Sequence, residues 1–180
     1  KPIKPEVTEK KKKHPIKTIK ILCSNKYFIL ITLAFAIIYT SLGLTGGSRI
    51  YYAKYVLGNE MINSTMTLFN YIPTILTIML IPIFAKKFGK IKALFVGFLF
   101  YGAGLILEIA GPVNLPMIYG GLVLQGIGHA ALYSCLFAIV GDVVDYSEWK
   151  DGIREEGLTY SVTSFGQKIG TGLGTAALGW

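Results

Sequence analysis

The sequence predicts an all-α membrane protein, a polytopic helical bundle. Of its 180 residues, 52% are hydrophobic and only 16% are charged, a composition too apolar for a soluble domain of this length. The apolar residues also gather in almost uncharged stretches of about 20 residues, which is the length a helix needs to cross a hydrocarbon core of about 30 Å. The expected crossings are residues 28–48, 63–84, 93–110, 117–140 and 157–180.

The basic residues predict how the bundle is oriented. Fifteen of the 18 lysines and arginines lie in residues 1–26, in the loop 86–92 and just after the fourth crossing. Only Arg49 and Lys54 lie between the first two crossings. By the positive-inside rule, residues 1–26 form a cytoplasmic loop and residues 27–180 form the transmembrane bundle. The net charge of +8 is explained by topology, so nucleic acid is not an expected partner.

Polar residues refine the first three crossings. The tyrosines that follow the first crossing fit an aromatic belt at the outer interface. Asn70 and Thr74 fall on one face of the second crossing together with Thr67 and Thr77, and this face is expected to meet protein or water. Glu108, in the last turn of the third crossing, is expected to extend to the outer headgroups and not to bind a ligand.

Three polar residues share one face of the fourth crossing because they are spaced by four: Gln125, His129 and Tyr133. His129 lies near the middle of the bilayer, and two interpretations stay open for it, a proton relay and a packing residue held by hydrogen bonds. Tyr133 is a candidate ligand contact because its ring can stack on an apolar face while its hydroxyl bonds a hydroxyl group. Ordinary helix packing is the alternative.

If the fourth helix continues past the membrane, Asp142 and Asp145 project from one of its faces. Such carboxylates most simply form salt bridges that hold the cytoplasmic side closed in one conformational state. The basic residues considered as partners are Lys86, Lys87, Lys150 and Arg154. Asp142, Asp145 and Arg154 are therefore the candidates for a cytoplasmic gate. A magnesium site in an intramembrane enzyme is the alternative, but no nucleophile paired with a base lies nearby, so we do not expect an enzyme.

Lys168 is the central candidate site residue, because a lone cation near the middle of a membrane helix costs about 2.5–3.5 kcal/mol. Ser164 lies within about 60° of it on a helical wheel, as do Ser161, Thr171 and Thr175, so this face is expected to line a polar cavity. The opposite face carries a ladder of small residues that would let a neighbouring helix approach closely. The ladder consists of Gly166, Gly170 and Gly174.

The segment DVVDYSEWKDGIREEGLTYSVTSFGQKIG resembles the signature after the tenth helix of the glycoside-pentoside-hexuronide:cation symporters, the melibiose permease type of the major facilitator superfamily. NKYFILI, YYAKYVLGN and KKFGKIKALFVGF fit the same family in the same order. The resemblance implies that the five crossings are helices seven to eleven of a twelve-helix transporter in the plasma (inner) membrane. We accordingly expect the chain to be a C-terminal-half fragment, since it begins without methionine and ends within an apolar run.

The resemblance also implies a function, sugar:cation symport by alternating access. Lys168 matches the functionally important lysine of helix eleven, and Ser164 lies in the sugar-side segment of that helix. Tyr133 matches an aromatic sugar contact on helix ten. Thr163 falls at a polar family position, although the helical wheel places it away from Lys168.

The partners implied by the resemblance are a small-molecule sugar or glycoside, a coupling cation, membrane lipid and the N-terminal half of the polypeptide. The cation (Na⁺, Li⁺ or H⁺) is expected at residues in that N-terminal half, outside this chain. No other cofactor is expected, and Cys23 and Cys135 have no metal-ligand spacing. Two alternatives stay open: a lipid or amphiphile transporter of the same fold, and a membrane scaffold or enzyme that depends on the carboxylates.

Overall fold

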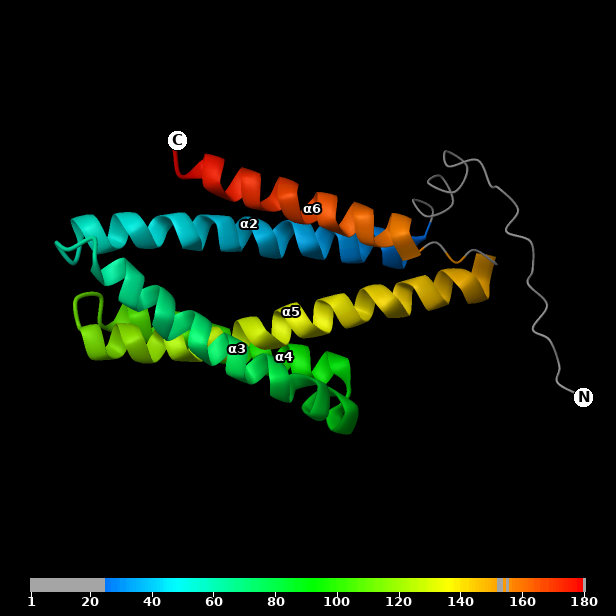
Figure 1. Cartoon of the computed structure of the whole chain (residues 1–180), viewed down its shortest axis with the longest axis horizontal. Coiled ribbons are helices and arrows are strands. Elements are labelled where there is room, and N and C mark those ends of the chain that lie inside the picture. Colours follow the sequence, from blue (N-terminus) through cyan, green and yellow to red (C-terminus); the bar gives the residue numbers. More distant parts are fainter. Residues whose placement is uncertain (1–24, 152–153, 155, 180) are drawn as a thin grey trace, which may run out of the picture.

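The computed structural model describes residues 25–151, 154 and 156–179, and within this part of the chain all regular structure is helical. The helices form a bundle in which successive elements run in alternating directions (Figure 1). They are α2 (Lys26–Tyr55), α3 (Ile62–Phe88), α4 (Lys90–Ala110), α5 (Leu115–Asp151) and α6 (Glu156–Ala177). The predicted all-α class is confirmed. The expected cytoplasmic loop lies almost wholly outside the described residues.

Four of these helices, α2 to α5, are long and apolar enough to cross a membrane. α6 is not among them, although its 22 residues would be about 33 Å long. Its polar side chains and its lysine lower its hydropathy, and a fifth crossing therefore stays a prediction. α6 lies beside α2 and runs in the same direction (Figure 1).

The helices extend further than the uncharged stretches of the sequence. α2 starts after Asn25, whose side chain accepts a hydrogen bond from the Tyr27 N–H, and it continues to Tyr55 without a break at Arg49. α3 and α4 are separated only by Gly89, which has a φ of 92° and thus a conformation that favours glycine. α5 runs on to Asp151, so the fourth helix does project beyond its apolar part.

Glycines bring the helices together in two groups. Gly166, Gly170 and Gly174 of α6 rest on the backbone of α2, as the small-residue ladder predicted. On the other side of the bundle, α4 and α5 approach closely where Gly97 faces Gly128 and where Gly104 faces Gly121. The bundle therefore consists of a pair, α2 with α6, and a trio in which α5 packs on α3 and α4.

The pair and the trio are joined mainly between α2 and α5. Apolar side chains of α2, including Phe28 and Phe35, pack on Leu136 and Val140 of α5. At the end of the bundle where α2 begins, Asn25 Nδ2 donates a hydrogen bond to Ser147 Oγ at 3.0 Å. Within the trio, the polar face of α3 meets protein as expected. Asn70 and Thr74 are buried and donate hydrogen bonds to backbone carbonyls of α5.

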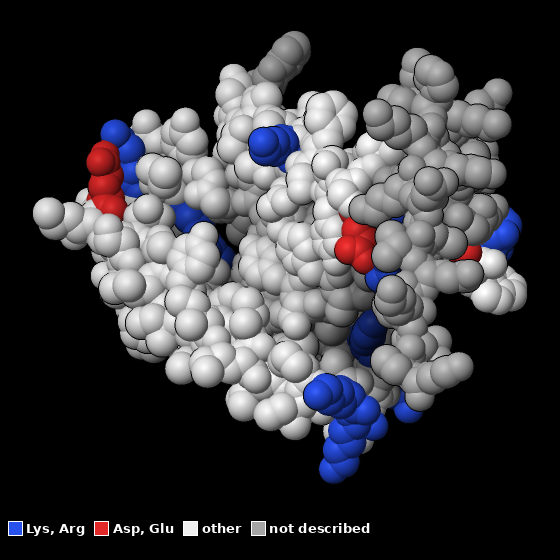
Figure 2. Space-filling model, turned by 45° about the vertical axis from the view of Figure 1, so that its right-hand side comes forward, with Lys and Arg blue, Asp and Glu red and all other residues white. Residues whose placement is uncertain are grey.

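The outer surface is suited to lipid. Large apolar side chains such as Ile37, Leu99 and Ile106 are at least 69% exposed. On the described part of the face shown in Figure 2, charged side chains form a few separate groups among uncharged residues. An exterior of this kind belongs in hydrocarbon and not in water.

Candidate substrate and gating sites

Lys168 and Ser164 lie on the same side of α6. Both are exposed, and together with Tyr160, Ser161 and Phe165 they line an open hollow. This face points away from the glycine ladder that packs on α2. The structure thus brings Lys168 and Ser164 together, as the helical wheel predicted.

Thr163 lies elsewhere. It is completely buried, and its hydroxyl donates hydrogen bonds to backbone carbonyls of the preceding turn, with 3.0 Å to the Tyr160 oxygen. This is the placement that the helical wheel predicted, away from Lys168. A ligand in the hollow beside Lys168 would not reach Thr163 in this conformation, so the role suggested for Thr163 gains no support from the geometry.

Tyr133 lines a different cavity, of about 230 Å³, between α2, α4 and α5. Ile37 and Ser41 of α2 and Tyr101 of α4 contribute to the same cavity, as does His129. The ring of His129 packs between Tyr101 and Tyr133, with centroid separations of 4.9 and 5.7 Å. The sugar-contact candidates Tyr133 and Lys168 are therefore separate in the described part of the chain, and both roles stay predictions.

A polar cluster that no sequence pattern indicated lies in the half of the bundle that contains the α2–α3 and α4–α5 turns. Arg49 was expected in an outer loop, but it lies within α2, and its Nη2 donates a hydrogen bond to Gln125 Oε1 at 2.9 Å. Glu108 was expected to extend to the headgroups. Instead its carboxylate turns inward, with Oε1 buried, and it interacts electrostatically with Arg49. Both side chains turn into the bundle because polar groups lie there on neighbouring helices: the Gln125 amide accepts a hydrogen bond from Arg49, and the Arg49 charge attracts Glu108.

Depth along the helices is the signal that could have found this cluster. Arg49 directly follows the first crossing, Glu108 lies near the end of the third, and Gln125 lies in the first half of the fourth. The first and third crossings run in one direction and the fourth runs in the opposite direction, so these three positions lie at similar depth. Opposite charges at one depth are expected to pair.

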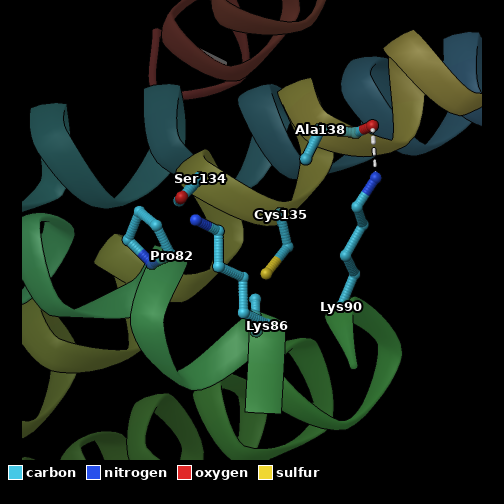
Figure 3. A pocket seen from close by; sticks show the side chains of 7 residues that line it. Pro82, Lys86, Lys90, Ser134, Cys135 and Ala138 are labelled. Atoms are coloured by element: carbon cyan, nitrogen blue, oxygen red, sulfur yellow. Dashed lines mark hydrogen bonds between the residues drawn. The ribbon is translucent and has the colours of Figure 1, made fainter. Parts of the chain in front are cut away.

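The end of the bundle that contains the α3–α4 turn has salt bridges of the kind expected for a cytoplasmic gate, with one change of partner. Asp142 pairs with Lys90, at 2.6 Å between Nζ and Oδ1, and not with Lys86, Lys87, Lys150 or Arg154. Lys90 Nζ also donates to the Ala138 carbonyl at 3.2 Å. Figure 3 shows Lys86 and Lys90 reaching from the α3–α4 turn towards α5 across a pocket of about 300 Å³ that also contains Cys135. These contacts tie the turn to the end of α5.

Arg154 forms salt bridges with three carboxylates near the end of α5 and the start of α6. Its guanidinium contacts Asp145 at 3.3 Å, Glu148 at 2.6 Å and Glu156 at 2.6 Å. The hydrogen bonds to Glu148 and Glu156 raise the pKa of Arg154 further above its usual value, so it remains charged at any physiological pH. Arg154 therefore links the end of α5 to the start of α6. All of these groups are well exposed, so each bridge adds little to stability in water.

Comparison with known proteins identifies the chain. The family described as MFS/sugar transport protein matches residues 2–180. An isoprimeverose transporter of Lactiplantibacillus pentosus is 28% identical over 97% of this chain and 37% of its own length. A putative sulfoquinovose importer of Salmonella typhimurium is 35% identical over 69% of this chain and 26% of its own length.

A glucuronide carrier protein homolog of Escherichia coli is 27% identical over 87% of this chain and 35% of its own length. The chain thus spans between about a quarter and somewhat over a third of these relatives. No solved structure matches it. The family match over almost the whole sequence, together with the apolar helical bundle, shows that the chain belongs to the MFS/sugar transport protein family.

Proposed function

We propose that this chain is part of a longer transporter that carries a sugar or glycoside together with a cation by alternating access. The observation that carries the proposal is the family match over residues 2–180. Relatives named as transporters or carriers of isoprimeverose, glucuronide and raffinose support a sugar as the substrate. The remainder of such a transporter would supply the second half of the substrate path.

In this proposal the exposed face of α6 lines the path. Lys168 and Ser164 offer a cation and a hydroxyl on a face that α2 leaves open. A lone lysine is costly in a membrane helix unless it meets water or polar groups, which a sugar path would provide. At the cytoplasmic end, the bridges of Lys90 with Asp142 and of Arg154 with Asp145 would close the path in one state and separate in the other.

The test is uptake by the full-length transporter in membrane vesicles. Radiolabelled isoprimeverose, raffinose, a glucuronide, a galactoside and sulfoquinovose are offered with and without a sodium or proton gradient. We expect gradient-dependent accumulation of one of them, lost in Lys168→Ala and kept in Lys92→Ala. Lys92 is a matched control because it is an exposed lysine at the start of α4.

Absence of uptake of every sugar by a correctly inserted protein would reject the sugar substrate and favour a lipid or amphiphile. Accumulation that persists in Lys168→Ala would instead keep the sugar and remove Lys168 from the path.

A further inference from the structure

Unsatisfied polar atoms are concentrated at one place in the bundle. Within the described part of the chain, three buried side-chain atoms have no hydrogen-bond partner in the protein: Glu108 Oε1, Gln125 Nε2 and His129 Nε2. Gln125 and His129 are 0% and 5% exposed. Leaving such groups unpaired is costly, so a bundle that gathers three of them is expected to use them.

Arg49 lies at the centre of this cluster. Its guanidinium is bonded to Gln125 and acts electrostatically on both Glu108 and His129. Gln125 and Glu108 are neighbours, although by strict geometry neither Gln125 Nε2 nor Glu108 Oε1 completes a hydrogen bond. Arg49 and Glu108 lie on helices able to cross a membrane, and their opposite charges attract each other without forming a direct ion pair.

Glu108 is the member of the cluster whose charge can change. An arginine cannot be deprotonated in a protein, and an amide does not titrate. His129 lies beside the Arg49 cation, which repels a second positive charge. Glu108 is half-buried in the last two turns of α4, near the outer surface from which a proton can reach it. The titratable groups around Glu108 and Arg49 come from four helices. They are Tyr52 of α2, Tyr71 of α3, Tyr101 of α4, and His129 and Tyr133 of α5.

We propose that Glu108, Arg49 and Gln125 form a proton-binding site in the outer half of the bundle. A proton from the outer solution adds to a Glu108 carboxylate oxygen and gives the neutral acid. Arg49 then retains its bond to Gln125 but has lost its counter-charge within the membrane. Protonation therefore weakens the attraction between α2 and α4, and it favours a conformation in which Arg49 reaches water or another acceptor.

This site goes beyond the proposed function, in which the coupling cation binds outside this chain. The proposed proton site does not depend on the identity of the transported molecule. A proton bound here would make the position of the α2 and α6 pair, relative to the trio, responsive to the outer pH.

Infrared difference spectroscopy of the full-length protein in liposomes tests the site directly and requires no substrate. The carbonyl band of protonated carboxyl groups is followed during a pH titration of wild type, Glu108→Gln and Glu60→Gln. Glu60 is the matched control because it is an exposed glutamate at the outer end, paired with Lys54 at 2.8 Å. We expect Glu108→Gln to remove a titrating component that Glu60→Gln leaves in place.

Arg49→Gln should then move the midpoint of the Glu108 component to higher pH by about 1–3 units, because the charge that stabilises the carboxylate is gone. The Glu60 component should not move. If Arg49→Gln does not fold, Glu108→Asp is the second variant. It keeps the carboxyl group but moves it one methylene further from Arg49, so its midpoint should shift in the same direction by a smaller amount. The proposal would be overturned if Glu108→Gln kept every titrating carbonyl component. It would also be overturned if the midpoint of the Glu108 component stayed unchanged in the folded variants. Neither result depends on whether the substrate is a sugar.

Discussion

Substitution of Gly170 by alanine tests the packing of α6 on α2. A Cβ atom at Gly170 would collide with the Ala36 carbonyl oxygen, and it would lie 3.0 Å from the Thr40 nitrogen and 3.1 Å from the Tyr39 Cβ. None of these atoms is the end of a flexible side chain, so relief requires that one helix move away from the other. Gly172 is the matched control, since a Cβ there meets nothing within 4 Å.

The difference between the two variants isolates the packing cost. Each gains about 1 kcal/mol from the higher helix propensity of alanine. Only Gly170→Ala is opposed by overpacking, which typically costs about 1–3 kcal/mol. The free energies of unfolding of Gly170→Ala and Gly172→Ala should therefore differ by about 1–3 kcal/mol, with Gly170→Ala the less stable.

Thermal unfolding of the purified full-length protein measures this difference. One kcal/mol corresponds to about 2–4 °C in Tm for a chain of 150–250 residues and to less for the longer full-length protein, so a gap of roughly 1–4 °C is expected. Equal Tm values, or a more stable Gly170→Ala, would show that the close contact between α2 and α6 is absent from the native protein.

Three further predictions follow from other contacts. Lys90→Asp should alter the initial rate of uptake, and the exchange Lys90→Asp/Asp142→Lys should restore it; a double variant as impaired as the single one would argue against a bridge that acts as a gate. Lys168→Ala should abolish substrate binding in calorimetry while thermal unfolding stays within a few degrees of wild type, and retained binding would place the ligand elsewhere. Ser147→Ala should lower the free energy of unfolding by about 1 kcal/mol, because the buried Asn25 amide loses its acceptor; no change in Tm would show that the bond contributes nothing.

The sequence predicted those contacts that depend on the face of a single helix. The glycine ladder of α6, the polar face of α3 with Asn70 and Thr74, and the shared side of Lys168 and Ser164 all follow from a period of 3.6 residues. Each needs only the knowledge of which residues point the same way. The apolar composition then makes these helices membrane helices.

Contacts between helices could not be predicted in the same way. The uncharged stretch that marks the first crossing ends at residue 48, before the first charge. α2 nevertheless continues through Arg49, whose guanidinium donates a hydrogen bond to Gln125 of α5. The partner of Asp142 was misassigned for a related reason. Gly89 reverses the chain, so Lys90 begins the helix that packs on α5, whereas Lys86 and Lys87 belong to the last turn of α3.

The length of α5 has a mechanical consequence. Its 37 residues make a rod of about 55 Å, nearly twice the thickness of the hydrocarbon core. A rod that pivots near His129 amplifies a small tilt: a rotation of roughly 10° displaces Asp142, about 20 Å along the helix from that pivot, by roughly 3.4 Å. That displacement exceeds the distance between the bonded atoms of Lys90 and Asp142. A modest rearrangement around Gln125 and His129 would therefore move Asp142 far enough to break the salt bridge.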